Sequence, residues 1–465
     1  MSAYYDGLLD LCGFEPGEIE AERPRIEKAF ARLRIGPDDM ETAEKTIRLN
    51  HDVTLRGVRK LLGAWLLELM DLVLAKDDGK KVFYFGYPSM IRPVTMLAAS
   101  NENLYCACPE TILCHALGQI FNKLTPLLEA GEQNGLPPGH SLCSLWQVKV
   151  GAMTLGMIPE PDLTMSSSFF CDMATKADDL LAVKYGSRIE YVDSVMDSEW
   201  GQYPDYLPEV LEFFGAEVDN LFLRVKETLG VELSADALEK ANSIMYNHYS
   251  RLGRLAKLMQ ADPMPVSSVE IWLATMVAAA CTGRGVPAAR RAMDILIEEI
   301  QERIEAGLGV VEKGAPRVMF FIGNFSDAGI MHMVEGAGLA ITTTFFTMPP
   351  PPKTDRTYNT LGEKLADVEL RAGLFHSTYG MLKRTEDNLD YLNLDGIILN
   401  YLHNCRPISI FSHSFKQFIE EKTGVPTLAL ENDLYDTRNY SAVSLGTRVE
   451  TFAQMLKARK ERMVA

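Results

Sequence analysis

Apolar and polar positions along this chain follow two different patterns. In residues 1–78 apolar side chains recur at helical spacing, as at Val58, Leu62 and Trp65, which predicts a helical N-terminal region. After it, short apolar runs alternate with helical stretches, beginning with the run at 81–86. Such alternation is typical of a mostly parallel sheet that helices cover on both faces.

The pattern divides the chain into four parts. We expect a helical N-terminal region, a first α/β domain, a helical segment and a second α/β domain, at 1–78, 79–203, 204–312 and 313–465. The predicted fold class is therefore α/β, with two Rossmann-like parallel-sheet domains, a helical N-terminal region and a helical insert.

Individual elements follow from the same pattern. Strands are predicted at 81–86, 104–109, 163–170, 188–193, 317–323, 339–346, 396–401 and 425–431. Helices are predicted at 110–127, from Ser144 to about Gly156, after Cys171 and at 444–462. Composition predicts a loop at 131–140. Ser267 and Glu270 have the spacing of a capping box at a helix start.

Composition and charge narrow the classes of function. The chain has 465 residues, 47% of them hydrophobic, and a net charge of -17, which argues against nucleic acid and anionic membranes as main partners. No basic segment followed by an apolar run begins the chain, so no signal peptide is expected. We expect a cytoplasmic enzyme, in which the eight cysteines are thiols or metal ligands rather than disulfides.

Three cysteines lie where a parallel sheet presents ligands. Cys171 follows one predicted strand and Cys405 follows another, while Cys143 begins a predicted helix. Ligands gather beyond the carboxyl ends of parallel strands, and a helix N-terminus favours thiolate over thiol. Thiolates bind iron–sulfur clusters and zinc, but without a Cys-x-x-Cys pair a zinc ribbon is disfavoured. The alternative is that these cysteines are small buried hydrophobes.

A second group of cysteines is open to two interpretations. Cys106 and Cys108 are two residues apart on a predicted strand and would point the same way, and Cys114 follows in the next helix. They are either packed in the core or extra metal ligands.

Several motifs taken together resemble the 2-hydroxyacyl-CoA dehydratase and benzoyl-CoA reductase family. The resemblance runs from about residue 81 to the end. Its motifs are Cys143-Ser144, Cys171-Asp172-Met173 with Lys176, the stretch from Asp395 through Cys405-Arg406-Pro407, and segments 424–433, 436–440 and 447–452. Two features depart from the family pattern: the segment between Cys143 and Cys171 is shorter than usual, and the first 80 residues match nothing.

The resemblance implies a cofactor and a reaction. It implies a [4Fe–4S] cluster on Cys143, Cys171 and Cys405, an acyl-CoA substrate, a related second subunit in a heterodimer or homodimer, and a separate ATP-driven iron–sulfur activator. A dehydratase of this family converts a 2-hydroxyacyl-CoA to an enoyl-CoA through a ketyl radical. The alternatives are a benzoyl-CoA reductase subunit, a double-cubane [8Fe–9S] reductase that uses Cys106 and Cys108, and a non-catalytic partner subunit. Whether a flavin accompanies the cluster stays open.

Polar residues near these cysteines have two readings each. His403, Asn404 and the hydroxyls of Ser166–Ser168 either tune the cluster or are ordinary strand-end residues. Arg406 either offsets cluster charge or forms an ion pair. We expect Asp433, Asp436 and Arg438 to fix the C-terminal turn. The loops 84–89 and 323–327, with Arg92, are candidates to line the acyl-CoA pocket. No P-loop is present, so ATP hydrolysis on this chain is not expected.

Overall fold

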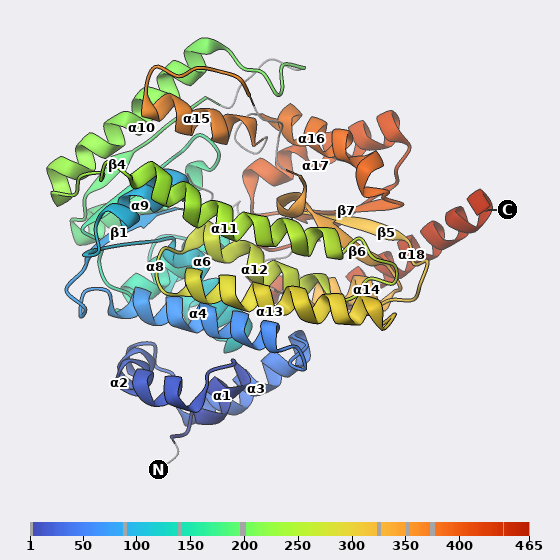
Figure 1. Ribbon diagram of the computed structural model, residues 1–465, viewed down its shortest axis with the longest axis horizontal. Coiled ribbons are helices and arrows are strands. Elements are labelled where there is room, and N and C mark those ends of the chain that lie inside the picture. The colour runs from blue at the N-terminus through green and yellow to red at the C-terminus, as the bar shows by residue number, and fades with distance from the viewer. Residues whose placement is uncertain are drawn as a thin grey trace.

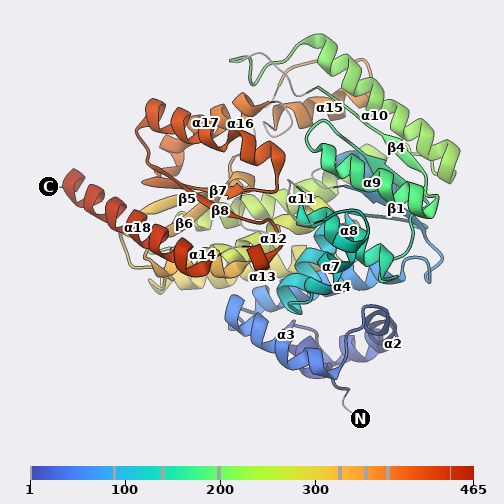
Figure 2. The same cartoon turned by 180° about the vertical axis from the view of Figure 1, so that it is seen from behind.

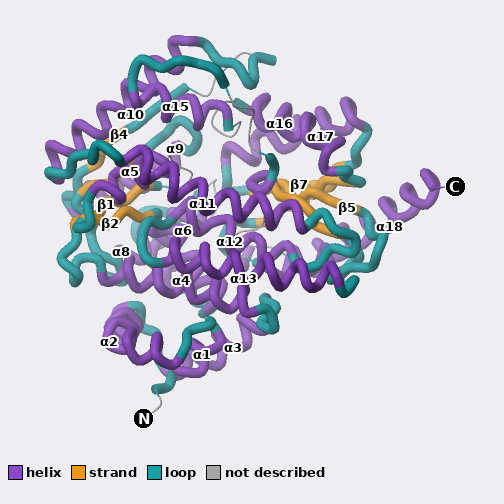
Figure 3. Tube along the Cα trace, viewed as in Figure 1, coloured by secondary structure: helices purple, strands orange, loops and turns teal. Residues whose placement is uncertain are grey.

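The computed structural model contains two parallel sheets that lie side by side, with helices around and between them (Figures 1 and 3). It describes residues 3–86, 91–137, 142–195, 201–322, 327–349, 354–372, 377–439 and 441–464. The predicted α/β class, with two parallel sheets, is confirmed.

The N-terminal region is helical, as predicted. Its helices are α1 (Asp6–Leu11), α2 (Pro16–Arg32), α3 (Pro37–Asn50) and α4 (Arg56–Leu74). Helices α1 to α3 form a layer at one end of the molecule (Figure 1). Helix α4 is buried on almost every side, because it lies between this layer and α13, against which it packs.

The first sheet has the strand order β2-β1-β3-β4, and its neighbouring strands are parallel. The strands are β1 (Lys81–Phe85), β2 (Leu104–Ala107), β3 (Leu163–Ser166) and β4 (Ile189–Tyr191). The helices of this half are α5 (Ile91–Ser100), α6 (Pro109–Leu113), the π-helix η1 (Cys114–Ile120), α7 (Thr125–Gln133), α8 (Ser144–Thr154) and α9 (Asp172–Tyr185).

The second sheet repeats this order as β6-β5-β7-β8, again parallel. The strands are β5 (Arg317–Phe321), β6 (Ala340–Thr344), β7 (Gly396–Leu402) and β8 (Thr427–Asn432). Around them lie α14 (Ala328–Gly336), η2 (Phe345–Thr347), α15 (Leu361–Arg371), α16 (Thr378–Leu392), α17 (Arg406–Thr423), η3 (Thr437–Asn439) and α18 (Ala442–Val464). In both sheets the strand order reverses between the first and third strands, where α/β folds bind ligands.

Four helices connect the two sheets: α10 (Pro208–Leu229), α11 (Ala237–Leu258), α12 (Ser268–Ala280) and α13 (Gly285–Glu305). Helix α11 packs against α5 of the first half and η2 of the second, and α12 packs against α6 and β6. The helical segment therefore contacts both sheets. The division of the chain into four separate ranges stays a prediction.

Two predicted elements near residue 130 were wrong. The single helix expected at 110–127 is divided into α6, η1 and α7, with a break at Asn122, whose φ is 50°. The loop expected from residue 131 begins later, because α7 continues through Gln133. Gly131 belongs to the helix because α7 and α8 touch there: a Cβ on Gly131 would lie 2.3 Å from the Gln147 carbonyl oxygen.

The capping box predicted at α12 is only half right. Ser267 is the N-cap, and its hydroxyl accepts a hydrogen bond from the Val269 amide. Glu270 instead lies against the His51 ring at 3.0 Å and accepts from the Asp52 amide at 2.7 Å. A tertiary contact to the loop before α4 thus replaces the local one.

Candidate functional site

The three cysteines occupy matching positions at helix starts. Cys171 is the N-cap of α9, after β3, and Cys405 is the N-cap of α17, after β7. They therefore follow equivalent strands in the two sheets. Cys143 is the N-cap of α8. Figure 2 shows α8 and α9 beside the first sheet and α17 beside the second.

The fold brings these three thiols close enough to influence one another. Burial raises the pKa of Cys143 well above its ordinary value, and the charges of Cys405 and Cys171 raise it further. Burial, together with Cys171, raises the pKa of Cys405 to about 12. Two sulfurs from the first half and one from the second thus share one region. Cys143 is buried, whereas Cys171 and Cys405 are partly exposed.

The spacing of the side chains does not suit a single metal ion. Among the residues that the structure describes, no group of three or more His, Cys, Asp or Glu side chains is arranged to hold one ion. Sulfurs that ligate a multi-iron cluster bind different irons, so they need not converge on one point.

Helix starts supply groups that favour the thiolate form. Burial raises the pKa of Cys171, while the amides of Ala174 and Met173 and the side chain of Trp146 lower it. The Leu145 amide acts in the same direction on Cys143, and the Ile408 amide on Cys405. Burial opposes ionisation of the free thiol, but a coordinating metal reverses that balance and binds the thiolate.

The three serines before Cys171 have different environments. The Ser166 hydroxyl donates to Asp178 at 2.7 Å, and the Ser168 hydroxyl donates to Asp193 at 2.8 Å. The Ser167 hydroxyl oxygen is buried and has no hydrogen-bond partner within the described part of the chain. Ser167 is therefore the member of this run that is available to a bound group near Cys171.

Asp433, directly after β8, joins two of the cysteine loops. Its Oδ1 accepts from the Ser144 hydroxyl at 2.6 Å, and its Oδ2 accepts from the Asn404 amide at 2.8 Å. Ser144 follows Cys143 in the chain, and Asn404 precedes Cys405. The Tyr435 and Asp436 amides also donate to Oδ1, each at 3.0 Å. The predicted turn is confirmed, but Asp433 reaches well beyond it.

An ion pair links the other two cysteine helices. Arg406, after Cys405, pairs with Asp172, after Cys171. Lys176 also contacts Asp172, at 2.6 Å. Partial burial raises the pKa of Asp172, but Lys176 and Arg406 outweigh this effect and leave that pKa below its ordinary value. Of the two readings for Arg406, the structure supports the ion pair.

The comparisons with known proteins agree with this arrangement. Residues 106–456 match the model of the family described as 2-hydroxyglutaryl-CoA dehydratase, D-component, a stretch that includes all three cysteines. The chain belongs to this family. The resemblance inferred from the motifs is thereby confirmed.

Individual relatives of this D-component-family chain are distant. It is 20% identical over 330 residues to the (R)-phenyllactyl-CoA dehydratase alpha subunit of Clostridium sporogenes, covering 69% of this chain and 78% of that protein. It is 21% identical over 309 residues to the (R)-2-hydroxyglutaryl-CoA dehydratase subunit alpha of Acidaminococcus fermentans, covering 66% of this chain and 62% of that protein. A short match of 75 residues, 28% identical, joins it to a benzoyl-CoA reductase subunit of Thauera aromatica, with 16% and 17% covered.

The second cysteine group in this D-component-family chain lies in the core. The Cys108 thiol donates to Glu110 at 3.2 Å and contacts the Thr111 hydroxyl at 3.1 Å. Cys106 is fully buried in β2, and Cys114 is fully buried in η1. Burial comes first among the causes that raise the pKa of each. Of the two interpretations, these contacts favour core packing.

Sequence reasoning missed a buried ionic group beneath the cysteine helices. Lys149 on α8 lies 2.6 Å from Asp178 on α9 and 3.9 Å from Glu110 on α6. All three side chains are almost fully buried. They fix α8 against α9, the helices that begin at Cys143 and Cys171. A lysine inside an apolar helical stretch is the signal that could have revealed this group.

Other candidates for the acyl-CoA pocket are placed only in part. Residues 87–90 and 323–326 lie outside the described residues. Arg92 donates to Asn242 at 2.7 Å. Burial raises the pKa of Glu369 to about 7, although the charge of Arg92 opposes this. Glu369 is thus a buried carboxyl that could exchange a proton near neutral pH, and no sequence motif indicated it.

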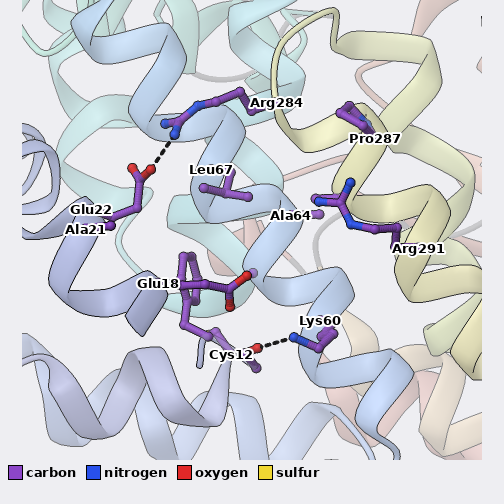
Figure 4. Close-up of a pocket in the computed structure, with 14 residues that line it drawn as sticks. Cys12, Glu18, Ala21, Glu22, Lys60, Ala64, Leu67, Arg284, Pro287 and Arg291 are labelled. Carbon is purple, nitrogen blue, oxygen red and sulfur yellow. Dashed lines mark hydrogen bonds and ion pairs between the residues drawn. The ribbon is translucent and has the colours of Figure 1, made fainter. Parts of the chain in front are cut away.

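A separate cavity of about 380 Å³ lies between the N-terminal helices and α4 and α13 (Figure 4). Its cations already have partners: Lys60 donates to the Gly13 carbonyl at 2.8 Å, and Arg284 pairs with Glu22 at 2.6 Å. None of the three cysteines at helix starts lines it. Within the described ranges, no helix is long and apolar enough to cross a membrane.

Proposed function

We propose that this chain is the iron–sulfur subunit of an acyl-CoA enzyme that dehydrates a 2-hydroxyacyl-CoA to an enoyl-CoA. The observation that carries the proposal is the convergence of Cys143, Cys171 and Cys405 from both halves of a D-component-family chain. Two of the relatives that cover most of this chain bear the names of 2-hydroxyacyl-CoA dehydratase alpha subunits.

The residues at this site fit a [4Fe–4S] cluster. Three thiols provide the soft ligands that iron–sulfur clusters need, and three helix starts provide amides that favour thiolates. The buried Ser167 hydroxyl could donate to a bound sulfur atom. With three protein ligands, one iron stays open, and the cluster would supply single-electron reduction and a Lewis-acidic site to a thioester.

The chain's own residues hold the reacting groups in place. Cys171 and Cys405 are partly exposed, so an acyl-CoA can approach the site from the side of these two residues. Trp146 and the Arg406–Asp172 pair fix the cysteine helices. Glu369 is a candidate to hold a proton for the departing hydroxyl group.

The proposed reaction needs partners. We propose a related second subunit, in a heterodimer or homodimer, and a separate ATP-dependent iron–sulfur activator that delivers the electron. The chain has no P-loop of its own. A cytoplasmic location accords with these partners.

Iron and sulfide analysis of anaerobically purified protein tests the proposal. We expect about four iron and four sulfide per chain. Protein that holds no iron, either as isolated or after anaerobic reconstitution, would overturn it. About eight iron per chain would instead support the double-cubane alternative.

A benzoyl-CoA reductase subunit is the second candidate, because 75 residues match such a subunit. The two candidates share the cluster and differ in substrate. With partner subunit and activator present, conversion of 2-hydroxyacyl-CoA esters supports dehydration. Ring reduction of benzoyl-CoA, with no conversion of hydroxyacyl esters, supports the reductase.

A further inference from the structure

Asp433 occupies the one place where the loops of Cys143 and Cys405 meet. It is 4% exposed and lies directly after β8, the last strand of the second sheet. The Ser144 hydroxyl reaches it from the first half, at 2.6 Å, and the Asn404 amide reaches it from the second half, at 2.8 Å. Ser144 and Asn404 are themselves buried. One carboxylate therefore ties together two cysteine loops that lie 262 residues apart.

The turn after β8 holds this carboxylate rigidly. The Tyr435 and Asp436 amides donate to its Oδ1 at 3.0 Å, and the Tyr435 amide also donates to the Ser144 oxygen at 3.0 Å. In these hydrogen bonds both oxygens act as acceptors, as an ionised carboxylate does. Asp433 thus cannot swing away from Ser144 without also breaking its own turn.

We propose that Asp433 is a positioning residue that sets the separation of Cys143 and Cys405 and places a negative charge beside the group that they bind. This inference rests on the proposed function, because the bound group is the proposed cluster. The charge already acts on the site, since after burial and the other two thiols Asp433 also raises the pKa of Cys143. A fixed negative charge makes the addition of an electron to a nearby cluster less favourable.

The same turn offers a matched control. Asp436 is 3% exposed, close to the value for Asp433. Its carboxylate bonds Arg438, at 2.8 Å, within the turn itself. Asp436→Asn therefore removes a buried carboxylate of the same turn but leaves the ties to Ser144 and Asn404 in place.

The test measures iron retention and midpoint potential in the full chain, reconstituted anaerobically with ferrous iron and sulfide. We expect the Ser144→Ala/Asn404→Ala double variant to lose iron to a chelator about tenfold faster than wild type. Asp433→Asn keeps an acceptor oxygen for the turn, so it should retain iron while its midpoint potential becomes more positive. Asp436→Asn should match wild type in both measurements.

Each outcome decides one question. The double variant keeps Asp433 and its turn, so it reports on the loop ties even if Asp433→Ala fails to fold. Wild-type iron loss in the double variant, or an unchanged potential in Asp433→Asn, would overturn the positioning role. A wild-type chain that takes up no iron would instead overturn the proposed function.

Discussion

Two groups of cysteines in one chain differ in where the fold places them. Cys143, Cys171 and Cys405 each begin a helix, and their sulfurs influence one another across the two halves. Cys106 and Cys108 are fully buried in the first half, and the Cys108 thiol contacts its own chain neighbours Glu110 and Thr111. The difference teaches that position at a helix start, more than residue type, makes a cysteine available for ligation.

Removal of a thiol from the first group should have the largest effect. Cys143→Ala, Cys171→Ala or Cys405→Ala leaves a cluster with two protein ligands, so iron per chain should fall by about tenfold or more and activity should disappear. Anaerobic iron analysis checks this. Full iron content in any one of the three variants would exclude that cysteine as a ligand.

Acid should weaken the core around the second group. Burial lowers the pKa of His115 to about 4, so the folded state binds a proton less readily than the unfolded state. Stability present above the ordinary pKa of 6.5 is then lost as the pH falls toward 4, by up to about 3 kcal/mol.

Urea unfolding between pH 7 and pH 4 measures this loss. His115→Gln should flatten the pH dependence, whereas the same change at His413, exposed on α17, serves as the control. An equally steep loss of stability in His115→Gln would show that other groups cause it.

The contact of α7 with α8 should matter more to the first group than to the second. A Cβ on Gly151 would lie 1.9 Å from the Leu127 carbonyl oxygen, so Gly151→Ala should destabilise the protein by about 1–3 kcal/mol and displace α8, which begins at Cys143. Gly253→Ala on α11 meets no atom within 4 Å and should be neutral or slightly stabilising. Thermal unfolding compares the two, and equal stability would contradict the close contact.

The smallest effect should come from the second cysteine group. Cys106→Ala removes a buried sulfur and should cost about 1–2 kcal/mol of stability with no change in iron content. Iron analysis and urea unfolding measure both quantities on the same preparation. A loss of about half the iron would instead identify Cys106 as a ligand and favour the double-cubane reading.

Much of the framework followed from the sequence because strand runs and helical periods are local signals. The eight strands and the cysteines at helix starts were predictable in this way. The roles of glycine were not, because Gly131 serves a contact with Gln147 rather than a turn. Capping signals misled for a similar reason, since Glu270 finds a partner at His51, far away in the chain.

The site itself was predictable only as a set of separate residues. Motifs identified Cys143, Cys171 and Cys405, and they indicated a turn at Asp433. The reach of Asp433 to Ser144 and Asn404 depends on how the two halves pack, and so does the pairing of Arg406 with Asp172. Such long-range contacts leave no periodic signal in a single sequence.

Helices α11 and α12 have a mechanical consequence for the site between the sheets. Each crosses from one half to the other, with α11 on α5 and η2 and α12 on α6 and β6. Rotation of one sheet against the other would have to bend or detach both crossbeams at once. The frame is therefore stiff, and the motions that admit a substrate and release a product belong to the loops at the strand ends.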